Sequence, residues 1–214
     1  MDMTLPEVSA RVGMPTTDVS RALASYVRSI LSGDSAYDRF VSGDRGALSL
    51  EQQEGLQIFR GKANCTACHV GPTFTDERFH NTGVAWRSGS LLDVGRAAVT
   101  GNDHDRGAFK TPSLREVART APYMHDGSLT TLEGVIDYYD RGGNVNPELD
   151  TDVRPLRLTA REKNAIRTFL ESLGGTILDG MQSGFNPDTR VTKSGRLANR
   201  MMTFCLYRPP PPSY

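Results

Sequence analysis

The chain has 214 residues, and its 25 basic and 25 acidic side chains give a formal net charge of zero and a pI near 6.9. This balance offers no electrostatic attraction for nucleic acid or an anionic membrane, so we expect neither as a partner. The sequence contains no apolar run of about 18 residues, the length that a transmembrane helix needs, so no membrane span is predicted. A chain of this length can bury one substantial core and still carry extensions.

The first predicted element is a helix that begins near Thr16 and Thr17. Apolar residues recur there every three to four positions, which places them on one helical face, and Gly33 is its predicted end. The residues of this face are Val19, Leu23, Tyr26, Val27, Ile30 and Leu31. Ahead of it, residues 1–6 have neither the basic start nor the apolar stretch of a secretory signal.

Three later helices are each predicted to open on a capping box, in which a Glu or Gln side chain reaches back to the capping Ser or Thr. The three pairs are Ser49 with Gln52, Thr130 with Glu133, and Thr159 with Glu162. Apolar residues follow each pair at helical spacing, and glycines at 142–143 and 174 end the last two helices. No convincing alternating strand pattern occurs, so the predicted fold class is all-α.

Two stretches lack this periodicity. Residues 70–130 are mostly Gly, Pro, Asp, Asn and Thr, and they are predicted to form long loops. After Gly175 the periodicity fades and the chain ends in a run of prolines, so residues 175–214 are predicted to be a weakly ordered tail.

Cys65, Cys68 and His69 form a C-x-x-C-H motif directly after the second predicted helix. In this pattern the two thiols bond to the vinyl groups of a haem, and the histidine binds its iron. We therefore predict a covalent haem c with His69 as one axial ligand. Loops wrapped round this apolar plate would bury surface that helices alone leave open, which accounts for residues 70–130. Assembly of haem c needs an oxidising compartment, so we expect a periplasmic location, although no signal peptide is visible.

Two other readings of the motif fit less well. A structural zinc site needs about four Cys or His ligands, and the only other cysteine, Cys205, lies far downstream. A thioredoxin-like pair would follow a strand in a βαβ unit, whereas this motif follows a predicted helix.

The sixth iron ligand decides between electron transfer and catalysis. Methionine is the usual ligand of a small electron-transfer cytochrome, and Met124 is the candidate outside the predicted tail. The methionines within the tail are Met181, Met201 and Met202. Met124 serves equally well as a packing residue, so the residues alone leave the sixth ligand open.

Several ordered motifs in the chain resemble one family. They are the segments 33–35, 79–83, 109–118 (FKTPSLREVA), 120–129 (TAPYMHDGSL), 131–133 and 169–170. Together they are similar to the C-terminal haem domain of bacterial di-haem cytochrome c peroxidases and their MauG-type relatives, over about residues 17–174. The resemblance implies a cytochrome c-like haem domain and an oxidoreductase that reduces hydrogen peroxide or uses it to oxidise a partner.

The resemblance also points to a different sixth ligand. In the peroxidases this ligand is a methionine on the helix after the H-D-G motif, and the family's spacing from His125 leads to Tyr139. The MauG-type branch is similar to this chain in carrying tyrosine there, so Tyr139 is preferred to Met124. A phenolate is a hard anionic donor that favours Fe(III), which implies a haem of low potential. The alternatives are a buried core tyrosine and a non-catalytic, single-haem electron-transfer module with Met124 as ligand.

Other positions carry weaker expectations from the resemblance. Thr120 and Pro122 match positions whose backbone carbonyls bind calcium between the two haem domains of the peroxidases. Arg115 is expected to neutralise a haem propionate, or to be a solvated surface residue. Trp86, His80, His104 and His125 are candidates for an electron path, ligands or proton carriers, although each is more simply a packing or surface residue.

The family's di-haem members need two C-x-x-C-H motifs, whereas this sequence contains a single one, at residues 65–69. We therefore expect residues 1–16 to be a connector from an N-terminal haem domain, 17–174 to be the electron-transferring haem half, and 175–214 to be the tail. The expected partners are that second haem domain and an electron-donor protein or an oxidisable protein substrate. The peroxide-reacting haem would belong to the other half.

Overall fold

The computed structural model describes residues 3–178, so the expectations for Cys205, for the three downstream methionines and for most of the predicted tail lie outside the described residues. The helices are α1 (Leu5–Val12), α2 (Thr16–Ser29), α3 (Ala36–Val41), α4 (Leu50–Arg60), α5 (Ala97–Thr100), α6 (Leu132–Asp140) and α7 (Ala160–Glu171). The strands are β1 (Leu31–Gly33), β2 (Phe79–His80), β3 (Trp86–Arg87), β4 (Ser90–Leu91), β5 (Phe109–Lys110) and β6 (Thr176–Leu178). None of the helices among residues 3–178 is long and apolar enough to cross a bilayer.

Two of the three predicted capping boxes are confirmed. The Ser49 side chain accepts a hydrogen bond from the Gln52 amide at the start of α4, and Thr159 does the same with Glu162 at the start of α7. The third prediction is one residue off, because Thr131 rather than Thr130 caps α6. Cap geometry depends on which side chain faces the first free amide groups, and adjacent threonines compete for that place.

The first helical segment is shorter than predicted, and the prediction of an all-α class is not confirmed. Helix α2 ends at Ser29, and the next residues form strand β1, so Gly33 belongs to a strand and is not a helix stop. Three small antiparallel sheets pair β1 with β6, β2 with β5, and β3 with β4. Strands of two or three residues are too short to show an alternating pattern, so the sequence could not reveal them.

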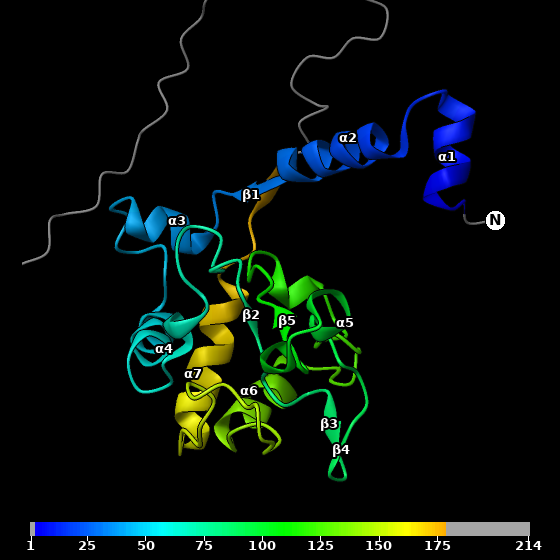
Figure 1. Ribbon diagram of the computed structural model, residues 1–214. Coiled ribbons are helices and arrows are strands. Elements are labelled where there is room, and N and C mark those ends of the chain that lie inside the picture. The colour runs from blue at the N-terminus through cyan, green and yellow to red at the C-terminus, as the bar shows by residue number, and fades with distance from the viewer. Residues whose placement is uncertain (1–2, 179–214) are drawn as a thin grey trace, which may run out of the picture. The chain divides into compact units, whose positions relative to one another are not determined.

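The core forms where α4 packs against α7, with α6 beside them (Figure 1). Phe59 of α4 and Phe169 of α7 are almost fully buried, with ring centroids 5.2 Å apart. The two helices approach closely at Gly55, because a Cβ atom there would lie 1.9 Å from the carbonyl oxygen of Ala165. The glycine in α4 is therefore required by packing, despite its poor helix propensity.

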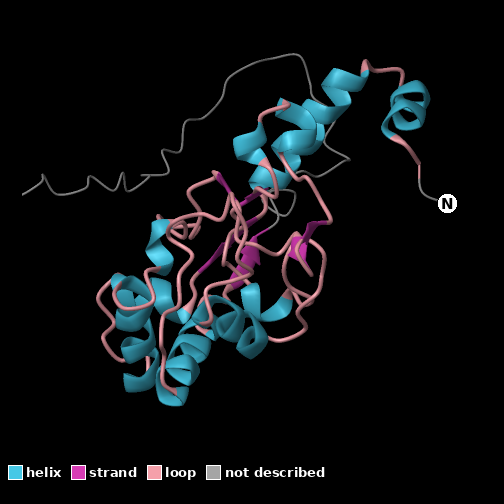
Figure 2. Ribbon diagram, turned by 60° about the horizontal axis from the view of Figure 1, so that its bottom comes forward, coloured by secondary structure: helices cyan, strands magenta, loops and turns pink. Residues whose placement is uncertain are grey.

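Residues 70–130 are mainly loops and turns, as predicted, with short helices and strands between them (Figure 2). Buried polar groups hold them together. The Asn81 side chain donates hydrogen bonds to the Arg106 carbonyl and to Asn146 Oδ1, at 2.8 and 3.0 Å, and its oxygen accepts the Gly83 amide. Such a satisfied network fixes irregular backbone that has little apolar surface of its own.

Candidate haem site

The C-x-x-C-H motif lies in a tight turn just after α4. Cys65 opens a single 3₁₀ turn, Cys65–Ala67, and the amide of His69 donates to the Cys65 carbonyl at 2.9 Å. This turn brings both cysteines and the histidine together within five residues of chain. The prediction that the motif follows the end of a helix is confirmed, since α4 ends at Arg60.

One hydrogen bond determines which nitrogen of His69 can bind a metal. The ring Nδ1 lies 2.8 Å from the backbone carbonyl oxygen of Phe74. A carbonyl only accepts, so Nδ1 must carry the proton, and Nε2 of the neutral ring keeps its lone pair. Burial lowers the pKa of His69, against the opposing effect of the Phe74 carbonyl, which favours this neutral form. The residue therefore has the tautomer that leaves Nε2 free to bind a metal.

The two thiols are free and uncharged. Burial raises the pKa of Cys65 to about 12 and that of Cys68 to about 11. Dithiol redox catalysis depends on a thiolate with a lowered pKa, so this environment does not favour it. Neutral, closely spaced thiols beside a histidine with a free Nε2 fit the donor set of haem c.

Tyr139 lies close enough to the motif for both thiols to affect it. Desolvation by burial raises the pKa of Tyr139 to about 12, the nearby Thr82 hydroxyl opposes this rise, and Cys65 and Cys68 add to it. The preceding Tyr138 has a different environment, because its hydroxyl donates to the Thr82 carbonyl at 2.9 Å and accepts the Asn144 amide at 3.2 Å. The hydroxyl of Tyr138 is thus bound to the backbone.

Met124 lines a different space. It borders a cavity of about 240 Å³ together with residues that include Val84, Leu129 and Tyr138. Its backbone has φ of 71°, in the turn that precedes α6. The residues that line this cavity include Tyr138 and do not include Tyr139.

Arg115 makes contacts within the protein. Its guanidinium forms a two-pronged ion pair with Asp38, at 2.8 and 2.7 Å, and its Nε donates to the Pro72 carbonyl at 2.8 Å. The Arg115 side chain is 12% exposed, so it is not a solvated surface residue. The expected contact with a haem propionate stays a prediction, because most of its donors already have partners.

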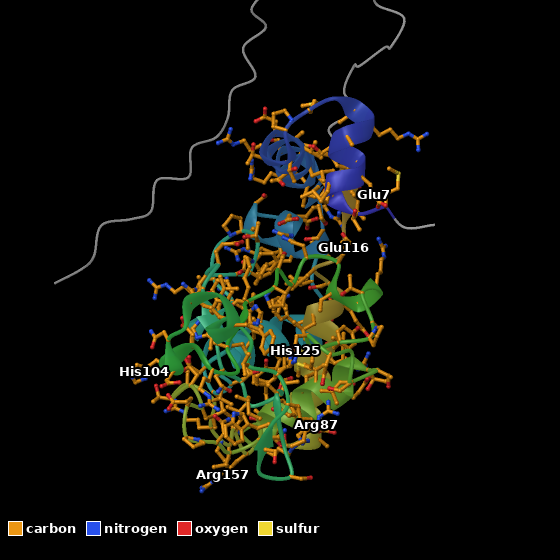
Figure 3. All side chains as sticks on the ribbon, turned by 45° about the vertical axis from the view of Figure 1, so that its right-hand side comes forward. Glu7, Arg87, His104, Glu116, His125 and Arg157 are labelled. Atoms are coloured by element: carbon orange, nitrogen blue, oxygen red, sulfur yellow. The ribbon has the colours of Figure 1, made fainter. Side chains whose placement is uncertain are left out.

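The remaining predicted residues are scattered. Thr120 and Pro122 are both exposed, on either side of Ala121, in the turn ahead of the H-D-G motif. His104 lies at the outer edge of the molecule in Figure 3, while His125 lies among other side chains and stacks on Phe109 at 3.6 Å between centroids.

Trp86 stands at the base of the β3–β4 hairpin. Its indole N–H is buried and has no hydrogen-bond partner among the described residues.

One feature beside the motif was not predicted. His80 lies between two carboxylates, with Nε2 2.9 Å from Asp76 and Nδ1 2.6 Å from Asp150. Burial lowers the pKa of His80, but these two hydrogen bonds outweigh it and the net shift is upward. Donor atoms of Cys68, Asp76 and His80 lie within 4.8 Å of one another. Only the fold places Asp150 beside His80, because the two residues are 70 positions apart in the chain.

Several curated proteins are similar to this chain in sequence. No family model matches the chain. The methylamine utilization protein MauG of Methylorubrum extorquens is 41% identical over 155 residues, covering 72% of this chain and 43% of that protein. The cytochrome-c peroxidase IdrP1 of a Pseudomonas species is 37% identical over 185 residues, covering 73% and 49%. The cytochrome c551 peroxidase of Nitrosomonas europaea is 32% identical, covering 73% and 44%.

Solved structures extend the likeness to the fold. A MauG-like protein associated with microbial copper homeostasis superposes with a TM-score of 0.60 at 34% identity, over 67% of this chain and 52% of that one. The diheme peroxidase BthA of Burkholderia thailandensis superposes with a TM-score of 0.54 at 23% identity, over 66% and 46%, and this likeness concerns the fold alone. The chain spans about half the length of the curated relatives it matches.

Proposed function

The chain belongs to the family of MauG proteins and bacterial di-haem cytochrome c peroxidases, and we propose that it is the electron-transferring haem half of such an oxidoreductase. Cys65 and Cys68 would anchor haem c through thioether bonds. His69 and Tyr139 would be the two protein ligands of its iron. The observation that carries this proposal is the turn of the C-x-x-C-H motif, in which the Nδ1 atom of His69 lies 2.8 Å from the Phe74 carbonyl oxygen and Nε2 is left free beside Cys65 and Cys68.

The chemistry of the donor set supports this arrangement. His69 offers Nε2 because its Nδ1 proton is held by the Phe74 carbonyl, so the ring enters ligation without a change of tautomer. Burial disfavours a phenolate at Tyr139, and a ferric ion would supply the positive charge that such an anion lacks. When bound, the haem supplies a one-electron redox centre, whose potential an anionic oxygen ligand lowers.

The two-haem activity is part of the same proposal. A second haem domain in the intact protein would react with hydrogen peroxide, and this chain would exchange electrons with it and with a donor or an oxidisable protein. Haem c attachment supports a periplasmic location. Calcium at the Thr120 and Pro122 carbonyls would lie between the two domains, since both residues are exposed here.

Replacement of Tyr139 tests the proposal. The chain should be exported through a c-type haem maturation pathway and checked for covalent haem by a denaturing haem stain. In Tyr139→Phe we expect the haem to remain attached, while the iron spin state and charge-transfer bands change and the reduction potential rises. Tyr138→Phe is the matched control and should leave the spectrum unaltered, because that hydroxyl is bonded to the backbone.

Met124→Leu separates the alternative function, a single-haem electron-transfer module. We expect its spectrum and potential to match those of the unsubstituted chain. A spectrum that changes in Met124→Leu and not in Tyr139→Phe would refute the tyrosine ligand. Absence of covalent haem in the exported chain would refute the whole proposal.

A further inference from the structure

Cys68, Asp76 and His80 together offer a sulfur, an oxygen and a nitrogen donor, and these donor atoms lie within 4.8 Å of one another. The amide of Asp76 donates to the Cys68 carbonyl at 2.9 Å, which holds these two residues side by side. Zinc binds such atoms at about 2.0–2.3 Å in a tetrahedron, which separates neighbouring donors by about 3.5 Å. A small movement of the Cys68 side chain would therefore bring all three donors within bonding distance of one ion.

Two carboxylates face the His80 ring, and the backbone holds both in the same way. The Oδ1 atom of Asp76 accepts the amide of Arg78 at 2.9 Å, and the Oδ1 atom of Asp150 accepts the amide of Asp152 at 3.0 Å. In each aspartate this leaves Oδ2 facing the imidazole ring. The carboxylates are therefore oriented by contacts that an incoming ion would not break.

The ring of His80 has a different task for each of its nitrogens. His80 lies in β2, which pairs with β5 (Figure 1), and its Nδ1 is 2.6 Å from Asp150 while its Nε2 is 2.9 Å from Asp76. A histidine that binds a metal almost always donates its other ring N–H to a carboxylate or carbonyl, which orients the ring and makes the binding nitrogen more basic. Asp150 is such a carboxylate, so Nε2 is the nitrogen that binds, on the side of Asp76.

The charges of the site balance when a divalent cation enters. Without the ion, both ring nitrogens of His80 face carboxylates and carry protons, and Cys68 is a neutral thiol. The ion replaces two protons, one from His80 Nε2 and one from the Cys68 sulfur, and both protons pass to solvent. The net charge of the site is therefore unchanged, and no oxidation or reduction is involved.

We propose that Cys68, Asp76 and His80 bind zinc, or a divalent cation of similar preference, in the chain to which haem is not yet attached. Water is the fourth ligand, and it has access because the side chains of His80 and Asp76 are 17% and 12% exposed. A zinc site based on the cysteines alone lacks ligands, whereas the fold provides a carboxylate and an imidazole instead.

The metal site rests on these contacts, and its consequence rests on the proposed function. Cys68 cannot bind a metal ion as a thiolate and hold a haem vinyl group as a thioether at the same time. The ion and the covalent haem therefore exclude each other, so a bound ion holds the chain in its haem-free form until it is removed.

Cobalt(II) tests the site, because it adopts the same tetrahedral geometry as zinc and shows a charge-transfer band when a thiolate binds it. The full 214-residue chain is produced without haem, kept reduced and titrated with Co²⁺. We expect one equivalent to bind with this band, and Zn²⁺ to abolish the band by displacement. Circular dichroism of the same samples records any folding that the ion induces, since metal binding and folding are coupled.

Substitutions identify the ligands. Cys68→Ser should remove the charge-transfer band, and His80→Asn should abolish stoichiometric binding. Asp150→Asn should weaken binding about 10–100-fold, the usual effect of losing the carboxylate behind a metal-binding histidine. Asp152→Asn is its matched control, because it removes the same charge from a side chain that contacts Asn64 instead of the ring, and it should bind as the unsubstituted chain does.

The other cysteines provide further controls. Cys65→Ser and Cys205→Ser should retain the band, because the proposed site uses neither thiol. Mass spectrometry after alkylation should show that Zn²⁺ protects Cys68 and leaves the reactivity of Cys65 unchanged.

Several results would overturn the proposal. Absence of binding would exclude the site, and a band lost in Cys65→Ser but kept in His80→Asn would assign the ion to the C-x-x-C-H motif itself. Equal affinities in Asp150→Asn and Asp152→Asn would contradict the role of Asp150. Tight Co²⁺ binding by the haem-loaded chain would contradict the mutual exclusion. Covalent haem is scored by haem stain on separately exported samples, so failure of the proposed function is distinguished from failure of the metal site.

Discussion

Gly55 offers a direct test of the packing between α4 and α7. A methyl group at this position would lie 1.9 Å from the Ala165 carbonyl oxygen and 2.8 Å from Phe169 Cβ, and neither neighbour is a flexible side-chain end. To relieve these clashes, α4 and α7 would have to move apart, and this would disturb the most buried part of the core. Overpacking of this kind costs about 1–3 kcal/mol, and the helix propensity gained by replacing glycine with alanine returns about 1 kcal/mol at most.

We therefore expect Gly55→Ala to lower the free energy of unfolding by up to about 2 kcal/mol. Urea denaturation of the haem-loaded chain, followed by circular dichroism, measures it. Gly134→Ala in α6 is the matched control, because a Cβ atom there meets only Thr131 Oγ1, at 3.4 Å. That variant should be neutral or slightly more stable. Equal stability gains in both variants would refute the close-packed contact between α4 and α7.

Two further predictions concern ionic contacts. The pKa of His80 is raised above its usual 6.5, so its contribution to stability is complete below about pH 6.5 and is lost as pH rises through the folded-state pKa. Urea unfolding across this range should show stability falling with pH, and His80→Gln should flatten that slope; an unchanged slope would contradict the assignment. Arg115→Met should cost about 2–4 kcal/mol of unfolding free energy, because it leaves the Asp38 carboxylate unpaired in a largely buried site. Arg39→Met, which breaks an exposed pair, should cost about 0–1 kcal/mol, and equal losses in the two variants would count against the buried pair.

Much of the candidate site is local and could be read from the sequence. The C-x-x-C-H motif and the caps at Ser49 and Thr159 depend on residues within a few positions of one another. Short sequence patterns are therefore enough to predict them. The same holds for the buried face of α7, whose apolar spacing predicts what the structure buries. The motif and the two caps depend on neighbouring residues alone, whereas the apolar side of α7 also needs a partner to cover it.

The three-dimensional fold decided what depends on distant residues. It alone placed two carboxylates around His80, paired Arg115 with Asp38, and separated the backbone-bound Tyr138 from Tyr139. These outcomes depend on which surfaces meet, and that is determined by packing of whole elements and not by local preference.

Helix α2 shows the limit of sequence reasoning most clearly. Its apolar periodicity resembles that of α7, and periodicity alone predicts a buried face for both. The structure buries one face and leaves the other largely open, because α4 covers α7 while the described residues offer no such helix to Leu23, Val27 and Ile30. The sequence by itself determined that each helix has an apolar side. Only the tertiary structure decided which of these sides is covered, because a side chain is buried only when a second surface packs against it.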